Sequence, residues 1–214
     1  MNELTPKTIG IGIVVSIVSV MALFGIWKLT SKPSVPATVS IDVTDDDHKV
    51  GTASAKITLV EYSDFQCPAC RAYHPMIKQV IEKNKDKILF VYRHFPLQLH
   101  KNAQAAAAAS EAASDQNQFW QMHDKLFEGQ NDWADSDKPN DTFIQYAKDL
   151  KLDVEKFKKG MGSDRAKSKI KKDQESGVSF GVNSTPSFFL NGTKLDNPRS
   201  VEEFGKLIDD QFNK

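Results

Sequence analysis

Two short apolar runs rich in β-branched and aromatic residues stand out in the sequence. Residues 57–62 (ITLVEY) form the first run, and residues 88–95 (ILFVYRHF) form the second. Such runs are typical of strands that are buried on both faces of a sheet. The segment between them has a helical pattern through about Lys83, so together they predict a βαβ unit with two parallel strands. Glu61 is the one charged residue of the first run and is anomalous there.

A long helical region then interrupts the strand pattern. Helices are predicted, in chain order, over residues 103–113, 115–128, 141–150 and 154–177. The first is rich in alanine, a strong helix former whose small side chain suits close packing. The second begins with Asp115 as its N-cap and Gln118 three residues on, and it ends at Gly129. The last is expected to break near Gly160 and Gly162.

Strand signals return near the C-terminus. Residues 187–190 (SFFL) and 193–195 (TKL) flank an Asn191-Gly192 pair, which is typical of a β-hairpin turn. An amphipathic helix is predicted over residues 201–212. The order of strands, then helices, then strands predicts an α/β fold with a helical insertion at about residues 99–178.

The N-terminal part of the sequence carries a separate apolar pattern. Residues 8–27 contain no charged side chain, and these 20 residues, at about 1.5 Å each, reach across a hydrocarbon core of about 30 Å. We therefore expect a single transmembrane helix within residues 1–30. The alternative is a cleaved signal peptide, but its apolar region is usually shorter, and the nearest small-x-small site, at residues 35–37, lies too far away. Residues 31–45, with Pro33 and Pro36, predict an extended linker.

Composition limits the class of protein. The chain has 214 residues, 40% of them hydrophobic, which suits one globular domain at residues 46–214. It has 28 basic and 28 acidic residues, so no net charge favours nucleic acid as a partner. The charges that flank the apolar segment leave its orientation open, but a domain with two cysteines in a C-x-x-C motif functions best outside the cytoplasm. The prediction is a single-pass protein of the cell membrane with its domain on the extracytoplasmic side.

The two cysteines of the chain carry the predicted chemistry. They form the motif Cys67-Pro68-Ala69-Cys70, directly after the first predicted strand and at the start of the predicted helix. At a helix N-terminus, free backbone N–H groups and the helix dipole stabilise a thiolate, so the pKa of Cys67 should fall below the usual value of about 8.5. Cys67 is therefore the candidate nucleophile. Cys70, one turn into the helix, is placed to form a disulfide with it and to resolve mixed disulfides.

The same cysteine spacing occurs in other kinds of site. Haem attachment requires a histidine at position 71, where this chain has Arg71. Zinc would need four ligands drawn from Cys67, Cys70, His74 and either His94 or His100. No second close pair of ligands exists, so we expect no metal site. A purely structural disulfide across so short a loop would add little stability.

Three segments resemble the DsbA-like family of thioredoxin-fold oxidoreductases. They are residues 60–70 (VEYSDFQCPAC), 92–97 (YRHFPL) and 181–188 (GVNSTPSF), and the resemblance extends from about Gly51 to the C-terminus. It implies a thioredoxin fold with a helical insertion, and a cis peptide bond between Thr185 and Pro186 beside the cysteines. In the family, the residue before that proline offers its backbone to an extended substrate segment. Thr185 and Pro186 are therefore expected to bind substrate by β-augmentation.

The resemblance also accounts for Glu61. The family places a buried acid six residues before the first cysteine, where it assists proton transfer to and from the resolving thiol. A carboxyl desolvated in a central strand should have a raised pKa, which suits a proton carrier. The alternative is a structural ion pair with Arg93. Within the motif, Pro68-Ala69 replaces the proline and histidine of the family's best-known oxidant, so one cationic contribution to thiolate stability is absent.

These features predict an enzyme, a protein disulfide oxidoreductase that donates the Cys67–Cys70 disulfide to reduced translocated proteins through a mixed disulfide. Its expected partners are reduced or misoxidised protein substrates. The resemblance suggests reoxidation by a quinone-linked thiol oxidase in the membrane, and no organic cofactor is expected. A reductase or isomerase of the same fold is one alternative. Isomerases usually carry a separate dimerisation domain, for which the segment from Thr44 to Gly51 has no room, so we expect a monomer. A membrane-tethered chaperone or binding module without turnover is the alternative outside the enzymes.

Overall fold

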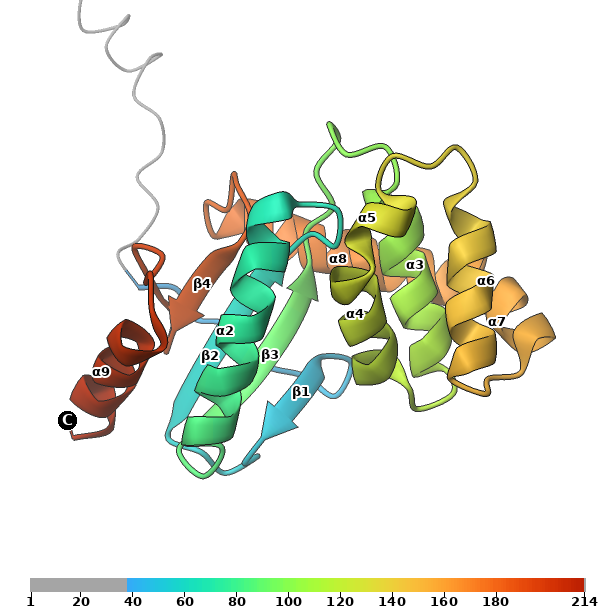
Figure 1. Cartoon of the computed structure of the whole chain (residues 1–214). Coiled ribbons are helices and arrows are strands. Elements are labelled where there is room, and N and C mark those ends of the chain that lie inside the picture. The colour runs from blue at the N-terminus through green and yellow to red at the C-terminus, as the bar shows by residue number, and fades with distance from the viewer. Residues whose placement is uncertain (1–37, 214) are drawn as a thin grey trace, which may run out of the picture. The chain divides into compact units, whose positions relative to one another are not determined.

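The computed structural model describes residues 38–213, which form a five-stranded sheet with helices on both faces (Figure 1). The strands are β1 (His48–Gly51), β2 (Ile57–Ser63), β3 (Ile88–His94), β4 (Ser187–Leu190) and β5 (Thr193–Lys194). The helices are α2 (Pro68–Asn84), α3 (Ala103–Ser114), α4 (Phe119–Glu128), α5 (Gln130–Trp133), α6 (Pro139–Asp149), α7 (Val154–Met161), α8 (Asp164–Ser179) and α9 (Val201–Phe212).

The sheet is mixed, with β2 and β3 at its centre. The strand order is β1-β3-β2-β4-β5, and β2 and β3 run parallel with Ile57 beside Ile88 and Ser63 beside His94. Six of the seven residues in each of these two strands are buried, which confirms the predicted central pair. Strand β1 was not predicted, because its four residues (HKVG) carry no strand pattern. Antiparallel pairing with β3 places it at the edge of the sheet.

Different helices cover the two faces of the sheet. Leu59 points to the face covered by α2 and α9 and shares a core cluster with Ile77 of α2. Its neighbours in β2 point the other way, as the alternation of a strand requires. Tyr62 packs with Phe95 on that second face, where α8 lies against β3. A Cβ atom added to Gly177 of α8 would lie only 2.7 Å from the Phe95 ring, so glycine permits this close approach.

Small side chains also bring the helices between β3 and β4 together. Ala109 and Ala112 of α3 are fully buried, and a Cβ atom added to Gly160 of α7 would lie 3.0 Å from the Ala112 methyl group. This contact confirms the close packing that the alanine pattern predicts. The predicted cap at Asp115 is wrong: Asp115 is the C-cap of α3, and α4 begins only at Phe119. The chain turns between the two helices at Asn117, whose φ is 60°.

The described end of the predicted linker packs on the domain. Val39 is 8% exposed, and its N–H donates a 2.8 Å hydrogen bond to the carbonyl oxygen of Gly192. Ile41 and Val43 pack against the same core cluster, so alternate apolar residues attach this segment to the second face of the sheet. Residues 38–45, which the sequence assigns to an extended linker, therefore include residues that pack on the domain. The predicted transmembrane segment, residues 8–27, lies outside the described residues, and no helix within residues 38–213 is long and apolar enough to cross a bilayer.

Candidate active site

The end of β2 places both cysteines at the start of α2. Cys67 is the N-cap residue of α2, with an extended backbone at φ −69° and ψ 121°, and Pro68 begins the helix. Proline is tolerated in the first turn because the N–H that it lacks would have no helical partner. Both sulfurs are free thiols here, with Cys67 7% exposed and Cys70 fully buried. Only Cys67 is therefore open to a second molecule.

The two thiols lie in opposite electrostatic environments. A hydrogen bond with the Cys70 thiol lowers the pKa of Cys67 to about 5, and backbone N–H groups of Cys70 and Ala69 act in the same direction against the effect of burial. Desolvation raises the pKa of Cys70 well above its usual value, and the negative charges of Cys67 and Glu61 raise it further. At neutral pH, Cys67 is a thiolate beside a protonated Cys70. This arrangement suits a nucleophile and a resolving thiol.

The segment at Thr185 and Pro186 lies against Cys67, although 118 positions separate Thr185 from it in the chain. The Thr185–Pro186 peptide bond is cis. The Thr185 carbonyl oxygen lies 3.4 Å from Cys67 Sγ and accepts a hydrogen bond from the thiol form of Cys67. Asn197 Nδ2 donates a 2.8 Å hydrogen bond to the Pro186 carbonyl oxygen and helps to hold this loop. The fold thus brings the predicted substrate-binding residues to the predicted nucleophile.

Glu61 is buried near Cys70 and makes no ion pair within the described residues. Its side chain is 5% exposed, and burial raises the pKa of the carboxyl from 4.5 to about 7, against a smaller opposing effect of the Ser63 hydroxyl. Arg93 does not reach it. The Arg93 guanidinium instead makes two 2.9 Å hydrogen bonds to Asp47 on the opposite face of the sheet. The alternative of a Glu61–Arg93 ion pair is therefore wrong.

Asp64 holds the loop after β3 next to the cysteine motif, a role that the sequence did not reveal. Its buried carboxylate accepts a 2.9 Å hydrogen bond from the backbone N–H of Leu97 and lies 2.6 Å from His100 Nδ1. Gln130 Nε2 of α5 donates a 3.1 Å hydrogen bond to the Cys67 carbonyl oxygen. These bonds join the loop after β3 and a helix of the insertion to the cysteines. An acid three residues before Cys67 was the available signal, but its partners come from distant segments.

The alternative zinc ligands do not gather around the cysteines. Among residues 38–213, possible ligand atoms of His, Cys, Asp and Glu converge in two groups, and neither contains a cysteine. His74 lies against Asp124 and His94 against Glu111, while His100 contacts Asp64. Among the described residues, Cys67 and Cys70 therefore form a dithiol pair with no further metal ligands gathered around it.

The fold and the site define the class of this protein, a thioredoxin-like domain with a reactive dithiol at a helix N-terminus and a cis-proline loop beside it. Comparison with known proteins agrees, since the family model described as Thioredoxin matches residues 43–210. A probable disulfide bond formation protein D from Bacillus anthracis is 32% identical over 174 residues, which are 77% of this chain and 78% of that protein.

Solved structures show the same architecture. The oxidised form of BdbD from Bacillus subtilis is 25% identical, with a TM-score of 0.71, and the match covers 83% of this chain and 99% of that one. A variant of α-DsbA1 from Wolbachia pipientis shares the fold at 24% identity and a TM-score of 0.71, over 80% of this chain and 92% of that one. The chain belongs to the thioredoxin family, in its group of DsbA-like thiol:disulfide oxidoreductases.

Some longer relatives contain a similar region. The Na(+)/H(+) antiporter NhaA 3 of Salinispora tropica is 34% identical over 169 residues, which are 78% of this chain but 25% of that protein. This chain thus spans about a quarter of that relative's length. The transport named for the longer protein is not assigned to this chain.

Proposed function

We propose that this chain is a thiol:disulfide oxidase that donates its Cys67–Cys70 disulfide to reduced proteins outside the cytoplasm. The observation that carries the proposal is the contrast between the two thiols, because the pKa of Cys67 is lowered to about 5 while that of Cys70 is raised. A stable Cys67 thiolate favours the reduced protein over its disulfide. The disulfide form therefore tends to oxidise the thiols of a partner protein.

The proposed reaction has two thiol exchanges. A substrate thiolate attacks Cys67 Sγ of the disulfide, the bond to Cys70 breaks, and Cys70 leaves as a thiolate that takes up a proton. A second substrate thiolate then attacks the substrate sulfur of the mixed disulfide and releases Cys67 as a thiolate. Two electrons pass from the substrate to the enzyme, and the substrate gains one disulfide.

Glu61 is the proposed proton carrier for Cys70. With a pKa of about 7, the carboxyl is partly protonated at neutral pH and can both give and accept a proton. It also lines a cavity of about 210 Å³ that α2 and α4 border, together with exposed Lys78 and Glu82. This cavity supports the proposal because it offers the buried carboxyl a path for proton exchange with solvent.

Thr185 and Pro186 are proposed to hold the substrate beside Cys67. Within the part of the chain that the structure describes, no backbone group accepts a hydrogen bond from the Thr185 N–H. An extended substrate segment could pair with this free main chain as an added strand and bring its cysteine to Cys67 Sγ. Pro68 and Ala69 complete the motif without a charged side chain.

The remaining parts of the proposal concern the cellular setting. We propose that residues 8–27 anchor the chain in the cell membrane with the domain on the extracytoplasmic side. A quinone-linked thiol oxidase in the same membrane would restore the disulfide. The chain would act as a monomer, with the cysteine pair as its redox centre and no organic cofactor.

Equilibration of the full-length protein with mixtures of reduced and oxidised glutathione tests the redox direction. An oxidase should become reduced at a much lower proportion of reduced glutathione than thioredoxin requires, measured side by side. A pair as resistant to reduction as that of thioredoxin would favour the reductase alternative.

Two cysteine variants test turnover. Cys70→Ser should accumulate mixed disulfides with substrate proteins, because Cys67 remains but cannot be resolved, whereas Cys67→Ser should form none. Unchanged thiol oxidation by Cys67→Ser would refute the proposed chemistry. Client binding that persists in Cys67→Ser without any thiol oxidation by the wild type would favour the chaperone alternative.

A further inference from the structure

Two histidines and an aspartate converge beside the active site. His74 belongs to α2, and His123 and Asp124 belong to α4. Asp124 Oδ1 lies 2.9 Å from His74 Nε2 and 3.1 Å from His123 Nδ1. All three ligand atoms lie within 4.8 Å of one another, and the two imidazoles are 8% and 7% exposed. The thiol chemistry proposed above uses none of these side chains.

We propose that His74, His123 and Asp124 form a binding site for a divalent transition metal ion of the zinc type. Tetrahedral zinc with nitrogen and oxygen ligands at about 2.0–2.2 Å separates neighbouring ligand atoms by about 3.3 Å. The two distances to Asp124 Oδ1, 2.9 and 3.1 Å, differ from this value by less than about half an ångström. The third separation, between the two imidazole nitrogens, is at most 4.8 Å, so side-chain shifts that bring these nitrogens together convert the hydrogen-bonded cluster into a coordination site. Two imidazoles and one carboxylate are a donor set that suits zinc.

The adjoining cavity supplies a fourth coordination position. All three residues line the cavity of about 210 Å³, which has room for a water ligand. Glu82 also lines it, and a cation that enters meets this carboxylate as well as that of Asp124. An open position next to three protein ligands is typical of zinc sites that exchange a ligand.

Lys78 is the one basic side chain that competes for this cluster among the residues that line the cavity. Its Nζ lies 2.7 Å from Asp124 Oδ2, the carboxylate oxygen that faces away from the histidine contacts. The Lys78 side chain is 51% exposed and can move into solvent at little cost, because exposed ion pairs are weak. Lys78 thus leaves Oδ1 open, but its positive charge beside Asp124 weakens the binding of a metal cation there.

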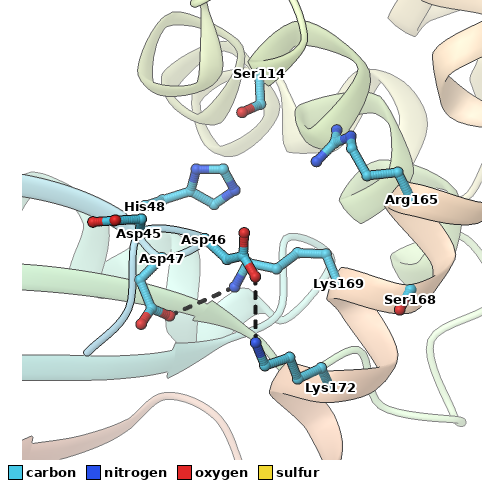
Figure 2. Close-up of a pocket in the computed structure, with 9 residues that line it drawn as sticks. All are labelled: Asp45, Asp46, Asp47, His48, Ser114, Arg165, Ser168, Lys169 and Lys172. Carbon is cyan, nitrogen blue, oxygen red and sulfur yellow. Dashed lines mark hydrogen bonds and ion pairs between the residues drawn. The ribbon is translucent and has the colours of Figure 1, made fainter. Parts of the chain in front are cut away.

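A second cluster, also of two histidines and one carboxylate, is less open to a metal ion. His48 Nε2 and His94 Nε2 lie 2.5 and 2.9 Å from Glu111 Oε1, and Arg165 occupies the other oxygen of Glu111 at 2.8 Å. Figure 2 shows the pocket beside His48, which Arg165 and Lys169 also line. Lys169 is 8% exposed, so an entering cation would meet a buried positive charge. This second cluster therefore serves as the control.

Zinc titration of the full-length, untagged protein in its disulfide form tests the site. The disulfide removes the thiolates, which would bind zinc themselves. Calorimetry should show one saturable site with a dissociation constant in the micromolar range or below. His74→Gln and Asp124→Asn should each weaken binding by at least about 10- to 100-fold, the loss known for residues that merely support metal ligands. His48→Gln should leave the dissociation constant unchanged.

A surface variant and a spectroscopic probe complete the test. Lys78→Gln removes the competing ammonium group at an exposed position and should tighten zinc binding without risk to the fold. Cobalt(II) should give the absorption of a tetrahedral site in the wild type but not in His74→Gln. The proposal is overturned if the wild type has no saturable site, or if both His74→Gln and Asp124→Asn bind zinc as the wild type does. If a ligand variant fails to fold, by circular dichroism, Lys78→Gln decides, and unchanged or weaker zinc binding contradicts the site.

Discussion

The substitution Glu61→Gln removes an ionisable group from the centre of the sheet while it keeps the shape and much of the hydrogen-bonding capacity of the side chain. The wild-type carboxyl has a pKa of about 7 in the folded protein, against its ordinary value of 4.5, because burial removes water from the charged form. The variant therefore separates the effect of charge from the effect of packing. We expect it to change the pH dependence of both stability and turnover.

The sign and size of the stability effect follow from these two pKa values. Between pH 4.5 and about 7, the folded chain keeps a proton that the unfolded chain has lost, so stability falls by about 1.4 kcal/mol for each pH unit. The stabilising contribution is complete below pH 4.5 and is lost as the pH rises through about 7, a total of about 3 kcal/mol. Glutamine cannot ionise. Relative to the wild type, the Glu61→Gln variant should therefore gain about 3 kcal/mol in the free energy of unfolding between pH 4.5 and 8.

Urea unfolding of the full-length protein across this pH range measures the effect. The fully buried Trp133 provides a fluorescence signal that changes on unfolding. Both proteins are compared in the disulfide form, so that cysteine ionisation does not contribute. Glu128→Gln is the matched control, because the Glu128 side chain is 62% exposed and its replacement should leave the wild-type pH dependence in place. In thiol oxidation assays, Glu61→Gln should be slower, with a flatter pH profile near neutrality.

One combination of results would refute this reasoning. If Glu61→Gln were several kcal/mol less stable than the wild type at every pH, the carboxylate would have an essential structural partner. If its turnover also kept the wild-type pH profile, the proton for Cys70 would come from another source. A stability difference that does not change with pH would by itself show that the folded-state pKa of Glu61 is close to its ordinary value.

Three further predictions test the thiols, the anchor and the helix packing. In the reduced protein, iodoacetamide should modify Cys67 with a midpoint near pH 5 and leave Cys70 unmodified, and equal rates would contradict their roles. The full-length protein should stay in the membrane fraction after carbonate extraction, and its release, or an N-terminus cleaved beyond residue 27, would rule out an anchor at residues 8–27. Gly177→Ala should destabilise the fold by about 1–3 kcal/mol, because the new methyl group would lie 2.7 Å from an aromatic ring. Gly205→Ala in α9 is the control, because a Cβ atom added there meets nothing within 4 Å, and it should stabilise the fold by about 0.5–1 kcal/mol in the same unfolding assay. If Gly177→Ala also stabilised the fold, helix propensity would outweigh the close contact.

The sequence determined features that depend on near neighbours along the chain. The apolar runs at residues 57–62 and 88–95 became the central parallel strands, and the amphipathic pattern at residues 201–212 matches α9. The position of Cys67 also followed from local order, because a residue between a strand and a helix lies at the helix N-terminus, where backbone N–H groups lower its pKa. Burial of Glu61 was predictable too, since a charge in a run of apolar residues shares the environment of the run.

Tertiary structure alone decided the features whose partners are distant in the chain. The edge strand β1 has no strand pattern of its own and exists through its pairing with β3. Asp64 and His100 lie 36 positions apart, and His74 and Asp124 lie 50 apart, yet both pairs are in hydrogen-bond contact. Periodicity shows which side of an element is buried but not which element covers it, and it gives no side-chain directions across that contact. The partners of Asp64, the true partner of Arg93 and the convergence of His74 with His123 and Asp124 therefore became visible only when α2, α4 and the loop after β3 had been placed around the sheet.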